Sequence, residues 1–146
     1  MTIHIELTTD PIAIDRYADR LDDPDVGSHG WFAGTTRRTT TTGDRTTITE
    51  TLDYHANESM AQVQLRDLAT SAKQQFALTH VVIVHRLGNV PVGSASVLVG
   101  CSSPHRRQTF DALPWIMDTL KRDVPIWKRE TDDDGDRHWV HPGLPT

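Results

Sequence analysis

The sequence predicts an α+β fold with a mainly antiparallel sheet and two long helices. Two segments carry apolar residues at helical spacing: residues 59–76 and the segment from Ser103 to Pro125. The rest of the chain contains short segments with the alternating or β-branched pattern of strands, several of them consecutive. This order of elements favours a layered α+β arrangement.

Further elements follow from local signals. A short helix is expected after Asp10 and Pro11, which fit an N-cap followed by proline. The segment 37–47 is polar and turn-rich, so we expect a mobile hairpin loop there, and residues 87–94 are typical of a turn. Strands are expected at 3–7, 30–36, 47–55, 80–86, 95–101, 126–131 and 137–140, the last two forming a hairpin.

The ends of the two long helices carry recognisable signals. Ser59 and Gln62 fit a capping box at the start of the first. Ser103 and Pro104 fit an N-cap with proline at the first helical position of the second. Pro114 lies inside the second helix, and we expect it to kink the helix there.

Length and composition limit the class of protein. The chain has 146 residues and a formal net charge of −5, which predicts one domain over residues 1–146 and argues against a general nucleic-acid partner. Cys101 is the only cysteine, so an internal disulfide is excluded and a reducing compartment is indicated. No apolar run approaches the roughly 20 residues that cross a bilayer, and the first ten residues lack a signal-peptide pattern. We expect a cytoplasmic protein without membrane contact.

Basic residues near the second long helix have two readings each. Residues 102–107 lie where a strand meets a helix N-terminus, so His105 and Arg106 would form a phosphate site, or simply be solvated bases beside an ordinary cap. Lys121, near the end of that helix, is also explained by the helix dipole. Lys128 follows on a short strand, where alternation alone would place it on the surface. The residues by themselves leave these alternatives open.

No generic catalytic or metal motif is present. We find no phosphate loop, dinucleotide fingerprint, zinc spacing or nucleophile elbow. His138 and His141 are close in sequence, but nothing completes a metal set, so no metal site is expected. Cys101 follows an apolar strand segment and is interpreted as a structural residue rather than a reactive thiol.

Several segments, taken in order, resemble the large subunit of molybdopterin synthase. The resemblance is strongest over residues 30–140. No one segment decides it, but the ordered set is highly specific. The matching segments are Gly34 to Arg37, Leu52 to Tyr54, His85 to Gly88, Val92 to Gly93, Ser102 to Arg106, Asp118 to Lys121, and Val124 to Glu130.

This resemblance implies a hammerhead-type α/β fold and a homodimer that forms the centre of a heterotetramer. Each end of the dimer would bind a small ubiquitin-like sulfur-carrier subunit, whose C-terminal glycine carries a thiocarboxylate. The implied activity is that of a sulfurtransferase, which converts cyclic pyranopterin monophosphate to molybdopterin by two successive sulfur transfers. No metal or other cofactor is implied.

The resemblance also implies a basic pocket and roles for its residues. Lys121 would act as a base or transient nucleophile, and Lys128 would stabilise charge or transfer a proton. His105 and Lys121 lie near opposite ends of the same long helix, so one small substrate cannot contact both within one chain. His105 and Arg106 would therefore reach a shared site from the other subunit. The alternative is a non-catalytic paralogue that binds the carrier or an anionic metabolite. Substrate anchoring is implied for Arg37, His105 and Arg106, with further contacts from Thr35, Thr36, Arg129 and Glu130.

Overall fold

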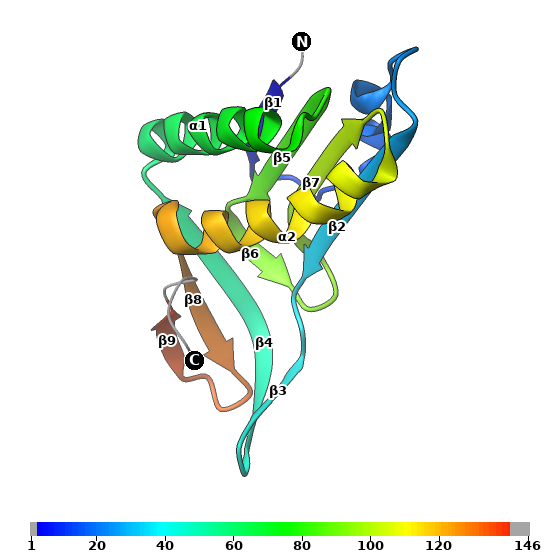
Figure 1. The fold of residues 1–146 in the computed structure, drawn as a ribbon. Helices are drawn as coiled ribbons and strands as arrows, with labels where there is room; N and C mark the ends of the chain where they lie inside the picture. The colour runs from blue at the N-terminus through cyan, green and yellow to red at the C-terminus, as the bar shows by residue number, and fades with distance from the viewer. Residues whose placement is uncertain (1–2, 141–146) are drawn as a thin grey trace.

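The computed structural model describes residues 3–140, so His141 lies outside the described residues. Its strands form two sheets, and two long helices lie side by side against one face of the first sheet (Figure 1). The second sheet continues from the end of the first and carries the C-terminal hairpin. This arrangement confirms the predicted α+β fold with mainly antiparallel pairing and two long helices.

The first sheet has the strand order β1-β5-β7-β2. Strands β1 and β5 run parallel, and the other neighbours are antiparallel. The connection between β1 and β5 contains β2 to β4 and the first long helix, and it is long enough to let the two strands run parallel. The bounds are Ile3–Thr8 for β1, Ser28–Thr35 for β2, His80–Arg86 for β5 and Ala95–Ser103 for β7.

The second sheet has the order β3-β4-β8-β9, with β6 also paired to β4, and every pair in it is antiparallel. Strand β4 is long enough to pair with three other strands along its length. The bounds are Thr39–Thr42 for β3, Arg45–Ala56 for β4, Gly88–Pro91 for β6, Ile126–Asp132 for β8 and Arg137–Val140 for β9.

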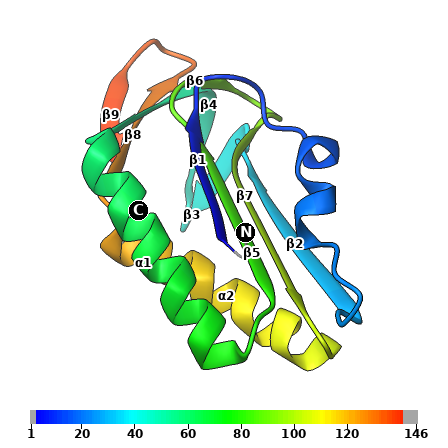
Figure 2. The same cartoon turned by 90° about the horizontal axis from the view of Figure 1, so that it is seen from above.

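Helices cover both faces of the first sheet. The long helices α1, Glu58–Phe76, and α2, Arg106–Asp123, pack on one face. Two short 3₁₀ helices, Ile14–Arg16 and Ala18–Leu21, lie on the other face (Figure 2). The sequence predicted one short α-helix in this region. Two single turns form instead, and Pro11 precedes both of them.

Strand β5 shows how the sheet is buried on both sides. Its side chains alternate, so Val81 and Ile83 join the core beneath α1 and α2. Val82 and Val84 pack instead against Leu21 and its neighbours under the 3₁₀ helices. A strand that is buried on both faces reads as a continuous β-branched run, as residues 80–86 do. Near its end, His85 lines a cavity beside the second sheet.

The helix caps differ from the sequence predictions. Asn57, not Ser59, caps α1, and its side-chain oxygen accepts a hydrogen bond from the Met60 amide at 3.1 Å. Helix α2 has His105, not Ser103, at its N-cap, and no side-chain hydrogen bond caps it. The Ser103 hydroxyl donates instead to the His105 carbonyl at 2.7 Å. Helix α2 also runs without interruption through Pro114.

Two predicted loops contain strands. Residues 88–91, predicted as a turn, form β6 and pair with β4 from Thr51 to Tyr54. Residues 39–42, predicted as loop, form β3 and pair with the start of β4, and Gly43 takes φ 61° in the turn between them. Four β-branched threonines favour a strand even without apolar neighbours, and their polar character obscured that preference.

Among residues 3–140, no helix has both the length and the apolar character needed to span a bilayer.

Candidate functional site

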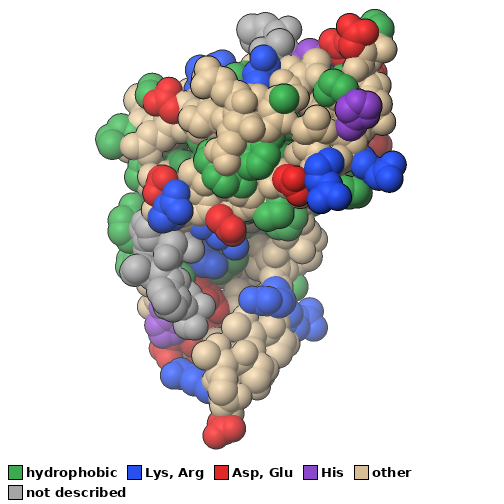
Figure 3. All heavy atoms as spheres, in the orientation of Figure 1, with side chains coloured by type: hydrophobic (Ala, Val, Ile, Leu, Met, Phe, Trp, Pro, Cys, Tyr) green, Lys and Arg blue, Asp and Glu red, His purple; other side chains and the backbone are tan. Residues whose placement is uncertain are grey.

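A cavity of about 530 Å³ opens where the second sheet meets the C-terminal end of α2 and the end of β2. In the space-filling view of Figure 3, Lys and Arg side chains gather around the hollow between the helices and the β3–β4 hairpin. Nineteen residues line the cavity: Phe32 to Arg37, Thr40, Thr49, Leu52, Tyr54, His85, Ser96, Met117, Leu120, Lys121, Val124, Ile126, Lys128 and Glu130.

Three cations reach this cavity from three separate parts of the chain. Arg37 follows the end of β2, Lys121 lies in the last turn of α2, and Lys128 lies on β8. Arg37 and Lys121 are exposed, whereas Lys128 is half-buried. The turn at Val124 and Pro125 reverses the chain between α2 and β8, which brings both lysines to the same opening.

The environment of Lys128 favours loss of its proton. Burial lowers the pKa of this ammonium group, and the positive charges of Lys121 and Arg37 lower it further, while Glu130 acts in the opposite direction. A lysine in such surroundings gives up its proton closer to neutral pH than a solvated lysine does. The role in charge stabilisation or proton transfer that the resemblance implies for Lys128 stays a prediction.

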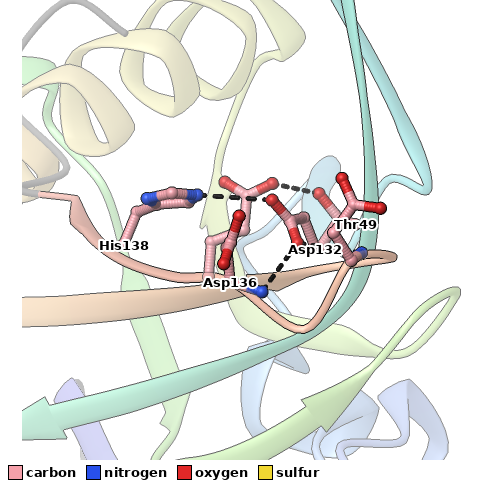
Figure 4. Close-up of polar contacts among 6 residues, drawn as sticks. Thr49, Asp132, Asp136 and His138 are labelled. Atoms are coloured by element: carbon pink, nitrogen blue, oxygen red, sulfur yellow. Dashed lines mark hydrogen bonds and ion pairs between the residues drawn. The ribbon is translucent and has the colours of Figure 1, made fainter.

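Glu130 is held in place on the cavity wall by β4. Its register partner is Leu52, and the Thr49 hydroxyl donates a short hydrogen bond to the Glu130 carboxylate; Figure 4 shows Thr49 beside this contact. Thr49 itself is buried. The carboxylate therefore has a fixed position, from which it partly offsets the charge of Lys128.

Thr35 and Thr36 also line the cavity, but they differ in exposure. Thr35 is exposed, whereas Thr36 is only 4% exposed. The backbone of Thr36 donates to the Ser94 carbonyl at 3.0 Å and accepts from the Gly93 amide at 2.9 Å. Its hydroxyl, in contrast, has no hydrogen-bond partner within residues 3–140. A buried polar atom of this kind is a candidate ligand contact.

Arg129 is the one predicted residue on β8 that the structure does not bring to the cavity. It alternates with Lys128 and Glu130 and therefore lies on the other face of the sheet. There it is 4.0 Å from the Asp53 carboxylate and lies over the Trp139 ring at 5.7 Å. Its predicted contact with a substrate requires a side-chain position different from this one.

His105 and Arg106 lie in a second hollow at the opposite end of α2. Both are exposed and line it together with Arg107, Phe110 and Asp111. Arg106 is the first residue of α2 and Lys121 lies in its last turn. Within one chain, the structure therefore separates these two bases from the cavity that contains Arg37, Lys121 and Lys128.

The acidic turn between β8 and β9 is shaped by its own hydrogen bonds. Asp132 accepts from the backbone amides of Asp134 and Asp136 at 3.0 and 2.9 Å, and the His138 ring lies 3.4 Å from its carboxylate (Figure 4). Carboxylate oxygens of Asp132, Asp134 and Asp136 approach within 4.8 Å of one another. These hydrogen bonds stabilise a tight turn, with Gly135 at φ 83°, and the turn accounts for the close approach of the three carboxylates.

Sequence reasoning missed several residues of the cavity wall. The aromatic and polar residues Tyr54 and His85 are buried on its floor, and Phe32 lies at its edge. Strand alternation could have identified one of them, because His85 points to the same face of the strand as the core residues Val81 and Ile83. No comparable signal marks Phe32, which depends on how β2 meets the second sheet.

Comparisons with known proteins agree on one family. The model of the MoaE protein family matches residues 7–123. A relative from Thermoplasma volcanium, named "Molybdopterin synthase catalytic subunit", is 35% identical over 93% of this chain and 96% of its own length. A relative of the same name from Drosophila melanogaster is 38% identical over 93% of this chain, but the chain spans only 36% of that relative's length.

A solved structure extends the agreement to three dimensions. The crystal structure of molybdopterin synthase from Staphylococcus aureus matches with a TM-score of 0.84 and 30% identity, and the match covers 92% of this chain and 95% of that one. The α+β fold predicted from the sequence is therefore a fold that these proteins share. The family match, the relatives and the structural likeness together show that this chain belongs to the MoaE family.

Proposed function

We propose that the chain is the catalytic subunit of a molybdopterin synthase, a sulfurtransferase that converts cyclic pyranopterin monophosphate to molybdopterin. Sulfur would arrive twice as the C-terminal thiocarboxylate of a small ubiquitin-like carrier subunit. The observation that carries the proposal is the convergence of Arg37, Lys121 and Lys128 on one cavity. Family membership supports it independently.

The charges of the cavity suit the two molecules that must meet there. The pterin precursor carries a phosphate and the carrier tail carries a thiocarboxylate, so both reactants are anions. A partly buried site that contains three cations and one carboxylate favours anionic groups over water. We propose that Arg37 anchors an anionic group through its planar guanidinium, with Thr35, Thr36 and Glu130 as further contacts.

The two lysines take different roles in this proposal. Lys121 is exposed at the opening and acts as base or transient nucleophile toward the carrier's thiocarboxylate. Lys128 is half-buried with a lowered pKa, which suits it to stabilise charge or transfer a proton as sulfur moves. Both lysines line the same cavity, so reactants bound there would lie near both amines.

Reconstitution tests the proposal and separates it from its rival. The chain is incubated with a thiocarboxylated carrier and the pterin precursor, and molybdopterin is measured together with carrier binding. Formation of product supports the enzyme. Carrier binding without product favours a non-catalytic paralogue that binds the carrier, and the absence of both contradicts the proposed enzyme. A carrier ending in an ordinary carboxylate is the matched control, because it retains the docking surface and lacks the sulfur.

Cys101 is expected to be dispensable for turnover. It is fully buried and its thiol contacts the Thr109 carbonyl at 3.9 Å. Burial raises the pKa of this thiol to about 12, so a reactive thiolate is disfavoured. Cys101→Ala should lower the free energy of unfolding by about 1 kcal/mol through lost packing while molybdopterin forms at close to the wild-type rate. A loss of turnover with an unchanged thermal midpoint would contradict a purely structural role.

The β3–β4 hairpin is expected to become protected when the cavity is filled. Of residues 39–43 only Thr40 is half-buried, and Thr40 lines the cavity. A ribbon with so few apolar contacts opens easily. Amide hydrogen exchange at Thr39–Gly43 should therefore slow when the carrier tail or the pterin binds, while α1 serves as the unchanged internal reference. Exchange in the hairpin that does not respond to either ligand would rule out closure over the site.

A further inference from the structure

His85 is a buried residue of the cavity lining and takes no part in the proposed reaction. It is only 4% exposed, and it pairs with Leu7 on β1 and Val97 on β7 near the end of β5. Strand alternation turns its side chain toward the core that contains Val81 and Ile83. That direction brings the imidazole to the cavity lining.

One hydrogen bond fixes the tautomer of this ring. Nδ1 of His85 lies 2.9 Å from the Arg86 carbonyl oxygen, which can only accept, so Nδ1 carries the proton and donates it. In a neutral ring Nε2 is then an acceptor. Within residues 3–140 the structure gives Nε2 no hydrogen-bond partner.

The surroundings keep the ring neutral and in place. Burial lowers the pKa of His85 to about 4, so the imidazole is uncharged at neutral pH. The Tyr54 ring, which also lines the cavity, packs edge-on against it with centroids 5.1 Å apart. Tyr54 thereby limits rotation of the imidazole and holds its acceptor nitrogen in one position.

The cavity thus changes in character from its opening to its floor. Arg37 and Lys121 are exposed, and Lys128 is half-buried. At the floor, Thr36 presents a buried hydroxyl without a partner and His85 presents an acceptor nitrogen. The cationic part suits phosphate or thiocarboxylate, whereas the floor suits an uncharged group that donates a hydrogen bond.

We propose that His85 positions the bound reactant, with Nε2 accepting a hydrogen bond from an N–H group of the molecule that enters the cavity. The inference rests on the proposed function and adds a residue to its site. An N–H group of this kind occurs both on the pterin ring system and along the glycine-ended peptide tail of the carrier. The shared chemistry is an uncharged N–H donor, and the experiment distinguishes the two sources.

Two substitutions separate hydrogen bonding from packing. His85→Phe keeps a planar ring without an acceptor, and His85→Gln offers a carbonyl oxygen near the position of Nε2. Affinity is measured separately for the pterin precursor and for a carrier ending in a carboxylate. His85→Phe should weaken one of the two about tenfold, and His85→Gln should recover most of that loss. The ligand whose affinity falls identifies the source of the N–H group.

His80→Phe is the matched control, because His80 begins the same strand, contacts Asp23 at 3.2 Å and lies outside the cavity lining. It should leave both affinities unchanged. Ring ¹⁵N NMR of the wild-type chain adds a test that needs no substitution, since the Nε2 resonance of His85 should shift when the ligand is added. Equal losses in both His85 variants, unchanged affinities, or a static resonance would overturn the inference. A wild-type chain that binds neither ligand would contradict the proposed function as well.

Discussion

Lys121→Ala is expected to reduce molybdopterin formation roughly 10²–10⁴-fold, the usual contribution of a positioned general acid or base. Lys121 is exposed in the last turn of α2 and lines the cavity. Because it contributes nothing to the buried core, the variant should fold and bind the carrier normally. Initial rates, carrier affinity and thermal midpoint are measured on the same preparation.

Arg122→Ala is the matched control for this prediction. Arg122 follows Lys121 on the same helical turn, its side chain is 68% exposed, and it pairs with Asp123 rather than lining the cavity. Its loss removes an equal charge from the same end of α2 and should leave turnover close to wild type. Near-normal turnover in Lys121→Ala, or an equal loss in Arg122→Ala, would remove Lys121 from the chemical step.

Mixing inactive Lys121→Ala and Arg106→Ala chains is expected to restore activity. Fifteen helical steps separate Arg106 from Lys121 on α2, which at about 1.5 Å per residue is about 22 Å. One small pterin cannot contact both ends of such a helix, and the structure places the two residues in different hollows. If both serve one site, Arg106 must come from the partner subunit of a two-fold dimer.

The expected recovery has a definite size. After random exchange about half of the dimers are mixed, and each mixed dimer has one pocket with both residues intact and one with neither. Overall activity should therefore reach about a quarter of wild type. The fraction of mixed dimers is verified with two distinguishable affinity tags. Mixed dimers that remain inactive would show that each pocket is completed within one chain.

The residue pattern alone left Lys121 and Lys128 open between a site and the surface, and the family resemblance implied a shared basic pocket. The structure brings both lysines to one opening, whereas their chemical roles stay predictions. Arg129 shows the limit of that reasoning. It stands between Lys128 and Glu130 in sequence, but strand alternation places it on the opposite face, beside Asp53.

The errors in secondary structure have a common physical origin. Residues 88–91 and 39–42 carry little hydrophobic pattern. Their strands form because they pair with β4, and a local sequence pattern does not show this tertiary pairing. Asn57 is the N-cap of α1 in place of the predicted Ser59, because the Asn57 side chain accepts a hydrogen bond from a free amide of the first turn. Similarly, the surroundings of His85 come from a cavity to which six strands and helix α2 contribute residues, and a local sequence pattern cannot show such an arrangement.

Mass spectrometry of the carrier offers the most direct test of sulfur transfer at this cavity. The chain is mixed with the pterin precursor and a limiting amount of thiocarboxylated carrier, and the masses of carrier and pterin are followed together. The account predicts that two carriers change from thiocarboxylate to carboxylate for each molybdopterin formed, and that this conversion is lost in Lys121→Ala. A carrier that stays thiocarboxylated while it is bound to the wild-type chain with the precursor present would contradict it.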